Sequence, residues 1–207
     1  MMLADPAKKR PWRQLRQAAT LEHVRRTIRR WREHTTTPPS VLAFDPSSTR
    51  TGYAYFDGPD VRPECGLIRP VEGGIGARAR SIYDDAAAAI AEHSPELVLV
   101  EAPSGKVARR LAGHGAGLSL YGFAVGVVAG AAMSSANPDC DVLLIDEPLW
   151  TRNQRKTTRR ASVELSVPTY CEIRDQDSGM DIADAIGLGL WFYGEYARAT
   201  RMERTTE

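Results

Sequence analysis

The chain has 207 residues, of which 43% are hydrophobic and 26% are charged, and its formal net charge at pH 7 is +1. This length supports one substantial hydrophobic core and is too short for two ordinary domains joined by linkers. The three cysteines are an odd number, which argues against a disulfide framework, and none stands in a spacing typical of a zinc site. There is no uncharged apolar run of about 18 residues and no apolar signal segment, so we expect a cytoplasmic protein that binds no membrane.

The charge is distributed unevenly along the chain. Residues 1–39 contain ten Lys or Arg and three acidic residues, so their net charge of +7 leaves −6 for the remainder. Within this segment apolar residues recur every three or four positions, which predicts an amphipathic helix with arginines on its other face. The apolar positions are Leu15, Ala18, Leu21, Val24, Ile28 and Trp31, and the arginines are Arg25, Arg26, Arg29 and Arg30. Pro38 and Pro39 cannot continue a helix and end it.

Two interpretations of this basic helix are open. In the first, its apolar face packs on the body of the protein or on a second copy of the chain. In the second, it is an arm whose arginines contact nucleic-acid phosphates, because clustered arginines gain affinity from counterion release. The two interpretations are compatible, since the apolar and basic faces point in opposite directions.

After Pro39 the sequence alternates between short apolar runs and longer helical patterns. The runs that predict strands are Val41–Phe44, Gly52–Phe56, Cys65–Ile68, Leu97–Val100 and Val142–Ile145; the helical patterns are Ile75–His93, Leu118–Met133 and a final helix with Ser178 as candidate N-cap. The Ser-, Thr- and Pro-rich turn between the first two strands predicts an antiparallel pair. We therefore expect an α/β domain with a mixed sheet at residues 40–199, preceded by the helical arm at 1–39 and followed by a tail at 200–207.

Four acidic residues stand where this organisation brings side chains together. Asp45 and Glu101 each follow a predicted strand, and the ends of neighbouring parallel strands meet at one edge of a sheet. Asp181 and Asp184 are three residues apart, so they share one face of the final helix. Because the rest of that helix is apolar and must be buried, its carboxylates need a compensating charge. Mg²⁺ or Mn²⁺ would supply it, and two such ions about 4 Å apart can act together in phosphodiester hydrolysis.

Each acid also has a purely structural interpretation. Asp45 precedes Pro46 in a segment with the composition of a turn, and Glu101 could be a solvated acid at the end of a strand. Asp181 and Asp184 suit the first turn of a helix, where the helix dipole favours acids. The occurrence of all four, in this order and on these elements, favours a shared metal site.

Three segments resemble the RuvC-type Holliday-junction resolvases. They are FDPSSTRTGYA at residues 44–54, VLVEAPSG at 98–105 and DIADAIGLGL at 181–190, similar to the first strand and turn, the strand with the glutamate and the last helix of that family. The resemblance implies the RNase H-like fold, with a mixed five-stranded sheet flanked by helices and here an additional N-terminal helix. It also implies a homodimer that cuts two symmetric phosphodiesters of a four-way DNA junction with two Mg²⁺ ions per active site, and no nucleotide cofactor. By motif position, the catalytic metal ligands would be Asp45, Glu101, Asp181 and Asp184.

The family also carries basic residues between its fifth strand and last helix. Here that region contains Arg152, Arg155, Lys156, Arg159 and Arg160, a density that favours phosphate contacts over a merely solvated surface. Arg160 stands where the family usually has a lysine, and since arginine does not act in proton transfer, Lys156 is the nearest lysine that could compensate. The family's aromatic wedge after the glutamate has no counterpart, so we expect junction contacts from Lys106, Arg109 and Arg110 instead.

Other functions share parts of this pattern. The segment DPSSTRTG also resembles the first phosphate loop of actin-like and sugar-kinase ATPases, but 207 residues leave no room for their second phosphate loop and second subdomain. A nuclease of the same fold that cuts forks, flaps or RNA-containing duplexes would carry the same acids. A catalytically silent DNA-binding dimer is the remaining alternative, and the presence of all four acids disfavours it.

Overall fold

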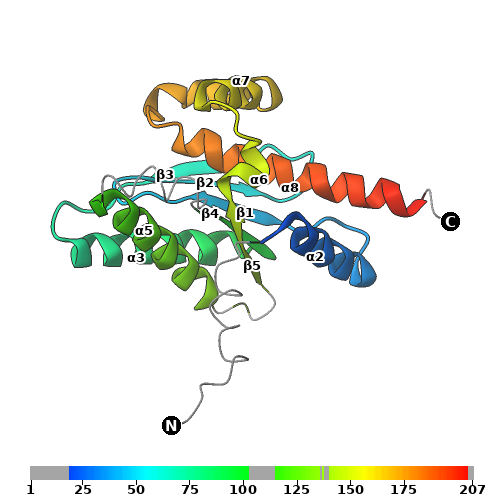
Figure 1. Ribbon diagram of the computed structural model, residues 1–207, viewed down its shortest axis with the longest axis horizontal. Coiled ribbons are helices and arrows are strands. Elements are labelled where there is room, and N and C mark those ends of the chain that lie inside the picture. Colours follow the sequence, from blue (N-terminus) through cyan, green and yellow to red (C-terminus); the bar gives the residue numbers. More distant parts are fainter. Residues whose placement is uncertain (1–18, 103–114, 136, 138–139, 205–207) are drawn as a thin grey trace, which may run out of the picture.

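The computed structural model describes residues 19–102, 115–135, 137 and 140–204. Its centre is a five-stranded sheet with the order β3-β2-β1-β4-β5 (Figure 1). The strands are β1 (Val41–Asp45), β2 (Thr51–Phe56), β3 (Glu64–Ile68), β4 (Leu97–Ala102) and β5 (Asp141–Asp146). Strand β2 is antiparallel to β1 and β3, whereas β1, β4 and β5 run parallel. The predicted mixed sheet and the antiparallel pairing of its first two strands are confirmed.

Helices cover both faces of this sheet. They are α2 (Leu21–His34), α3 (Ile75–His93), α5 (Gly115–Met133), α6 (Glu147–Thr151), α7 (Lys156–Ser166) and α8 (Asp181–Arg204), with the 3-10 turns η3 (Pro168–Glu172) and η4 (Arg174–Gln176) before α8. Figure 1 shows α8 crossing one face of the sheet and α3 and α5 on the opposite face. Within the described part of the chain, no helix is long and apolar enough to cross a membrane.

Side chains of the central strands alternate between two hydrophobic clusters, one on each face. On β1, Val41 and Ala43 belong to the cluster beneath α8, whereas Leu42 and Phe44 belong to the cluster beneath α3 and α5. Strand β4 alternates in the same way, and both strands are buried along their whole length. Because successive side chains of a strand point to opposite faces, this alternation also decides the direction of the acid that follows each apolar run.

The basic N-terminal segment contributes a helix to the core beneath α8. Before α2 begins, Ala19 forms a bridge with Ile145 of β5. Val24 and Ile28 of α2 are completely buried in the cluster that contains α8. The helix therefore packs on the body of the protein, as in the first interpretation of its apolar face. Two of the predicted apolar positions, Leu15 and Ala18, lie outside the described residues.

The arginines of α2 differ in their surroundings. Nη2 of Arg25 lies 3.3 Å from Oε2 of Glu195 on α8, and Arg30 pairs with Asp141 at the start of β5. Arg26 pairs with Glu22 of its own helix at 3.6 Å, and both of these side chains are exposed, as is Arg29. Two of the four arginines thus tie the helix to the body, and two face solvent, where contact with DNA stays a prediction.

Helix α8 begins at Asp181, later than an N-cap at Ser178 would place it. Ser178 instead accepts a hydrogen bond of 2.7 Å from Arg50. The buried carboxylate of Asp177 accepts the backbone N–H groups of Ile182 (3.2 Å) and Ala183 (3.0 Å), so Asp177 caps the helix. Ser and Asp are similarly favoured as capping residues, so local preference does not distinguish Ser178 from the buried Asp177 beside it.

Candidate active site

Asp45 and Glu101 lie side by side at one edge of the sheet. Strands β1 and β4 are in parallel register with Phe44 opposite Val100, so the next residues, Asp45 and Glu101, are neighbours. The alternation along each strand directs both carboxylates toward the face covered by α8. Both are buried, with relative exposures of 6% and 5%.

The first turn of α8 carries the other two acids to this edge. Asp181 and Asp184 are both buried. Their approach depends on Gly52, the cross-strand partner of Asp45 on β2. A Cβ atom on Gly52 would lie 2.1 Å from the carbonyl oxygen of Asp181, far inside contact distance. The absence of a side chain at residue 52 therefore lets the start of α8 lie directly against the sheet beside Asp45.

Burial and mutual repulsion govern the protonation of these acids. Burial, followed by the charges of Glu101 and Asp184, raises the pKa of Asp45 well above its ordinary value. Burial and the charge of Asp184 also raise the pKa of Glu101, to about 8. Burial likewise raises the pKa of Asp181. Carboxyl groups whose charges oppose one another in this way favour a cation among them.

Basic side chains already enter this cluster, most of them from α7. Arg159 donates from Nε to Oδ1 of Asp184 (2.8 Å) and from Nη2 to Oδ2 (2.7 Å), and both side chains are buried. Nζ of Lys156 lies 3.0 Å from Oδ2 of Asp184 and 3.9 Å from Oδ1 of Asp181. Nε of Arg50 lies 3.3 Å from Oδ2 of Asp181. The compensating charge that the sequence attributes to a divalent ion is therefore partly supplied by the chain itself.

Two residues that the sequence analysis did not single out hold Glu101. Trp150 of α6 donates its Nε1–H to Oε2 of Glu101 (2.8 Å), and Tyr121 of α5 donates its hydroxyl to Oε1 (3.2 Å). The guanidinium carbon of Arg159 also lies 5.2 Å from the centre of the Trp150 ring. Trp150 and Arg159 thus connect Glu101 on the sheet with Asp184 on α8.

The chemistry of the four carboxylates favours metal binding, whereas their spacing in this structure does not. Carboxylate oxygens suit hard divalent ions, and Oδ2 of Asp181 is a buried oxygen that accepts no hydrogen bond. Among the residues that the structure describes, however, no three Asp, Glu, His or Cys side chains are close enough together to hold an ion. The four acids therefore fit Mg²⁺ or Mn²⁺ by chemistry, and binding requires them to move closer around the ion.

Comparison with solved structures identifies the fold. A structure of Thermus thermophilus RuvC in complex with Holliday junction substrate matches with a TM-score of 0.57 and 19% sequence identity, over 77% of this chain and 94% of that one. The fold is that of the RuvC-type resolvases.

Two further solved structures support this identification of the fold. Another Thermus thermophilus RuvC structure has a TM-score of 0.55 and 17% identity, over 75% of this chain and 95% of that one. The yeast mitochondrial Holliday junction resolvase Ydc2 has a TM-score of 0.52 and 12% identity, over 90% and 98%. No protein-family model and no curated protein sequence matches the chain. The RNase H-like, RuvC-type architecture expected from the three sequence segments is confirmed.

The predicted DNA-contacting residues occupy different positions on this RuvC-type fold. Arg152 and Arg155 are exposed, between α6 and α7. Arg160 pairs with Glu164 of the same helix (3.4 Å) and donates to the carbonyl oxygen of Arg174 in η4 (3.3 Å). Arg159 differs from the expectation of a surface phosphate contact, because it is 5% exposed and bound to Asp184. Lys106, Arg109 and Arg110 lie outside the described residues.

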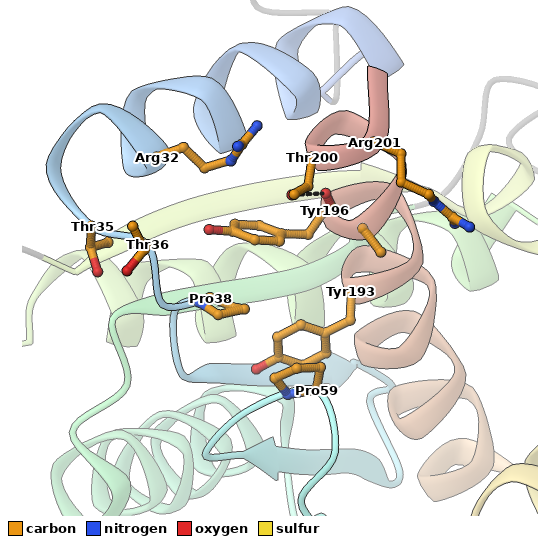
Figure 2. A pocket seen from close by; sticks show the side chains of 10 residues that line it. Arg32, Thr35, Thr36, Pro38, Pro59, Tyr193, Tyr196, Thr200 and Arg201 are labelled. Atoms are coloured by element: carbon orange, nitrogen blue, oxygen red, sulfur yellow. Dashed lines mark hydrogen bonds between the residues drawn. The ribbon is translucent and has the colours of Figure 1, made fainter. Parts of the chain in front are cut away.

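A pocket of about 450 Å³ lies toward the C-terminal end of α8, away from the four acids (Figure 2). Pro38 and Pro59 contribute to its lining, together with Tyr193, whose hydroxyl donates to the carbonyl oxygen of Pro39 at 2.8 Å. The side chains drawn in Figure 2 come from the end of α2, the segment after it and the second half of α8, with Pro59 from the segment between β2 and β3. This pocket is therefore part of the junction between α2 and α8, and it contributes no residue to the acidic site.

Proposed function

We propose that this chain is a divalent-metal-dependent endonuclease that, as a homodimer, resolves four-way DNA junctions by hydrolysing two symmetric phosphodiesters. The observation that carries the proposal is the approach of Asp45, Glu101, Asp181 and Asp184 at one edge of a RuvC-type sheet. One structural neighbour was solved with a Holliday junction substrate and another is a Holliday junction resolvase, which supports the same class of substrate here.

The four carboxylates would hold Mg²⁺ or Mn²⁺, as two ions in the arrangement that the sequence resemblance implies. When bound, such ions polarise the phosphoryl oxygens and lower the pKa of the attacking water. The protein contributes an ordered set of ligands. Trp150 and Tyr121 fix both oxygens of Glu101, and Arg159 fixes Asp184 from the side of α7. A ligand held by its own hydrogen bonds reorganises less when the ion and substrate bind.

DNA affinity would come from a different set of residues. Arg152 and Arg155 are exposed on the segment that leads into α7, which also carries Lys156 to the acids. Contacts of such residues with phosphates position the backbone without reading its sequence. This division between a buried acidic site and an exposed basic segment predicts that cleavage and binding can be separated by mutation.

The substrate is tested with a labelled immobile four-way junction beside a fork, a flap and a linear duplex, each with Mg²⁺ and with EDTA. We expect paired symmetric nicks on the junction in Mg²⁺ and no cleavage in EDTA. Comparable cleavage of forks or flaps would instead define a broader branched-DNA nuclease. An absence of cleavage with both Mg²⁺ and Mn²⁺ would contradict the proposal as a whole.

The separation of cleavage from binding is tested with Asp45→Asn. Removing one carboxylate charge from the site should lower the cleavage rate by more than about 100-fold, because loss of a residue that only supports a ligand already costs about 10- to 100-fold. Junction affinity should stay nearly unchanged in a gel-shift assay. Asp85→Asn, the same change on the exposed surface of α3, is the matched control and should leave both unchanged. An equal loss of binding and cleavage in Asp45→Asn would contradict the division.

A further inference from the structure

Lys156 lies among the acids that would have to hold the ion. Its Nζ atom is 3.0 Å from Asp184 Oδ2, 3.9 Å from Asp181 Oδ1 and 3.4 Å from the carbonyl oxygen of Gly179. Burial lowers the pKa of this ammonium group, but the charges of Asp45 and Asp184 raise it above its usual value, which indicates that Asp45 also lies near the group. Three of the four acids, one from the sheet and two from α8, therefore face a single cation that belongs to α7.

The other cation that α7 brings to this site, Arg159, is held much more firmly. Its guanidinium makes two hydrogen bonds to Asp184, donates a third to the carbonyl oxygen of Gln154 (2.9 Å) and stacks on Trp150. Its side chain is 5% exposed, whereas 49% of the Lys156 side chain is exposed. Displacing the planar guanidinium would break several hydrogen bonds at once. A lysine ammonium on a flexible side chain can instead move into solvent.

These differences give the two cations of α7 different roles. A divalent ion bound to Asp45, Asp181 and Asp184 would have to lie near the position of Nζ, and two cations at that separation repel each other. The described acids also do not converge closely enough to hold an ion while Lys156 lies among them. Displacement of Lys156 would remove this repulsion and leave the acids free to close around the ion.

We propose that Lys156 is a built-in counter-ion of the acidic site, and that its ammonium group and a divalent metal ion are alternative occupants of the space between Asp45, Asp181 and Asp184. The inference rests on the proposed function, because it assumes that these acids bind a metal. Arg159 remains on Asp184 in both states. Lys156 keeps the charges of the metal-free site balanced and leaves when the ion enters, so it lowers the affinity of the site for metal.

The test is the affinity of the full-length protein for Mn²⁺ without DNA, measured by calorimetry and by the electron paramagnetic resonance signal of free Mn²⁺. The variant is Lys156→Gln, which removes the charge from a half-exposed side chain and should fold. We expect it to bind Mn²⁺ about tenfold more tightly than the wild type, within the range that coupling between two ligands usually spans. The control Arg155→Gln removes the same charge from an exposed neighbour and should change this affinity by less than about twofold, because exposed charges are screened within about 10 Å.

Thermal unfolding gives a second measurement. In EDTA, Lys156→Gln should melt at a lower temperature than the wild type, because the acids lose a counter-ion. Saturating Mn²⁺ should raise the melting temperature of the variant more than that of the wild type, since a tighter ligand stabilises the folded state more at the same concentration.

The possible outcomes distinguish a failure of the proposed metal site from a failure of the proposed competition by Lys156. If the wild type binds no Mn²⁺, or binds it equally well after Asp45→Asn, the metal site itself is refuted and the inference with it. If Asp45→Asn abolishes Mn²⁺ binding while Lys156→Gln leaves the affinity unchanged or weakens it, the metal site stands and the competition by Lys156 alone is overturned.

Discussion

Asp45 is buried among other acids, so its ionised form is unfavourable unless a cation lies beside it. Burial, Glu101 and Asp184 all raise its pKa, and Lys156 acts in the opposite direction without reversing the shift. A residue placed in this way reduces the stability of the metal-free protein near neutral pH. Such a reduction is common at functional sites, where chemistry requires an arrangement that packing alone would not select.

This reasoning predicts how Asp45→Asn changes stability with pH. The folded state keeps the proton of Asp45 to a higher pH than the unfolded chain does, so stability from the protonated group is complete below the ordinary pKa of 3.8 and is lost as pH rises through the folded pKa. Asparagine resembles the protonated form at every pH. In EDTA, the stability gained by Asp45→Asn should therefore be small near pH 4 and grow by about 1.4 kcal/mol for each pH unit above it until the folded pKa is reached, so that it is larger at pH 8 than at pH 5.

The measurement is thermal unfolding of both proteins in EDTA from pH 5 to pH 9. The quantity of interest is the difference between variant and wild type, because other carboxyl groups titrate in both. Asp85→Asn on the exposed surface of α3 should show no difference that changes with pH. A loss of stability in Asp45→Asn, or a gain that is equal at pH 5 and pH 8, would show that Asp45 carries no unfavourable charge.

At the scale of residues, the sequence predicts site residues that stand in a recognisable local pattern. It does not predict those that reach the site only through tertiary contacts. Asp45, Glu101 and Asp184 follow recognisable strand and helix patterns, and the structure brings them together. Trp150 and Tyr121 could not be assigned in the same way, because their hydrogen bonds to Glu101 join residues 49 and 20 positions apart. The same limit explains Arg159, which reads as one of several basic surface residues until its contact with Asp184, 25 positions away, is known.

At the scale of elements, the short helix α6 links the sheet edge to α8. It follows directly from β5 and places Trp150 between Glu101 and α8. A Cβ atom on Gly187 of α8 would lie 2.9 Å from the Trp150 ring, so the indole fits only because residue 187 has no side chain. Trp150 is therefore a positioning residue whose hydrogen bond lowers the pKa of Glu101 while burial and Asp184 raise it.

Trp150→Phe tests this role, because it keeps an aromatic ring beneath Arg159 and removes the Nε1–H donor. Loss of a hydrogen bond to a charged group, about 1.5–3 kcal/mol, should raise the pKa of Glu101 further by about one unit or more. Metal binding requires the ionised carboxylate, so the pH at which Mn²⁺ affinity is half lost should move upward. The measurement is Mn²⁺ affinity without DNA between pH 6 and pH 9.

The control is Trp191→Phe, the same change at a partly buried position of α8. It should leave the pH dependence of Mn²⁺ binding unchanged. A weaker affinity for Trp150→Phe by the same factor at every pH would indicate a packing defect and not a hydrogen bond that controls Glu101.

The long elements follow from the sequence because their patterns are long enough to be specific. Helix α3 has the predicted bounds, and the ends of the predicted strands lie within two residues of the observed ones. Helix α6, at five residues, and the turns η3 and η4 carry no periodic pattern. Elements this short gain their stability from tertiary contacts, so a local pattern cannot predict them. The observed start of α8 differs from the predicted one for a related reason, because the hydrogen bonds of Asp177 to Ile182 and Ala183 are not visible in a local pattern.

At the scale of the whole molecule, α2 ties the basic N-terminal segment to the domain that carries the acids. Val24 and Ile28 are completely buried against that domain, so deleting residues 1–39 would open the core as well as remove positive charge. Such a deletion cannot separate DNA contact from packing. The two sets of arginines on α2 allow the separation, because Arg25 pairs with Glu195 whereas Arg29 is exposed.

Substitution of Arg29 should therefore affect DNA binding, and substitution of Arg25 should affect stability. Arg29→Gln should leave the melting temperature unchanged, and if α2 contacts phosphates it should weaken junction binding and reduce the slope of log affinity against log salt by about one. Arg25→Gln should lower the melting temperature, because it removes one of the partners of Glu195, a carboxylate with only 3% of its side chain exposed. The first measurement is thermal unfolding. The second is junction binding over a series of salt concentrations, with proteins that also carry Asp45→Asn so that the junction stays uncut. An unchanged salt slope in both Arg29→Gln and the double variant Arg26→Gln/Arg29→Gln would assign α2 to packing alone.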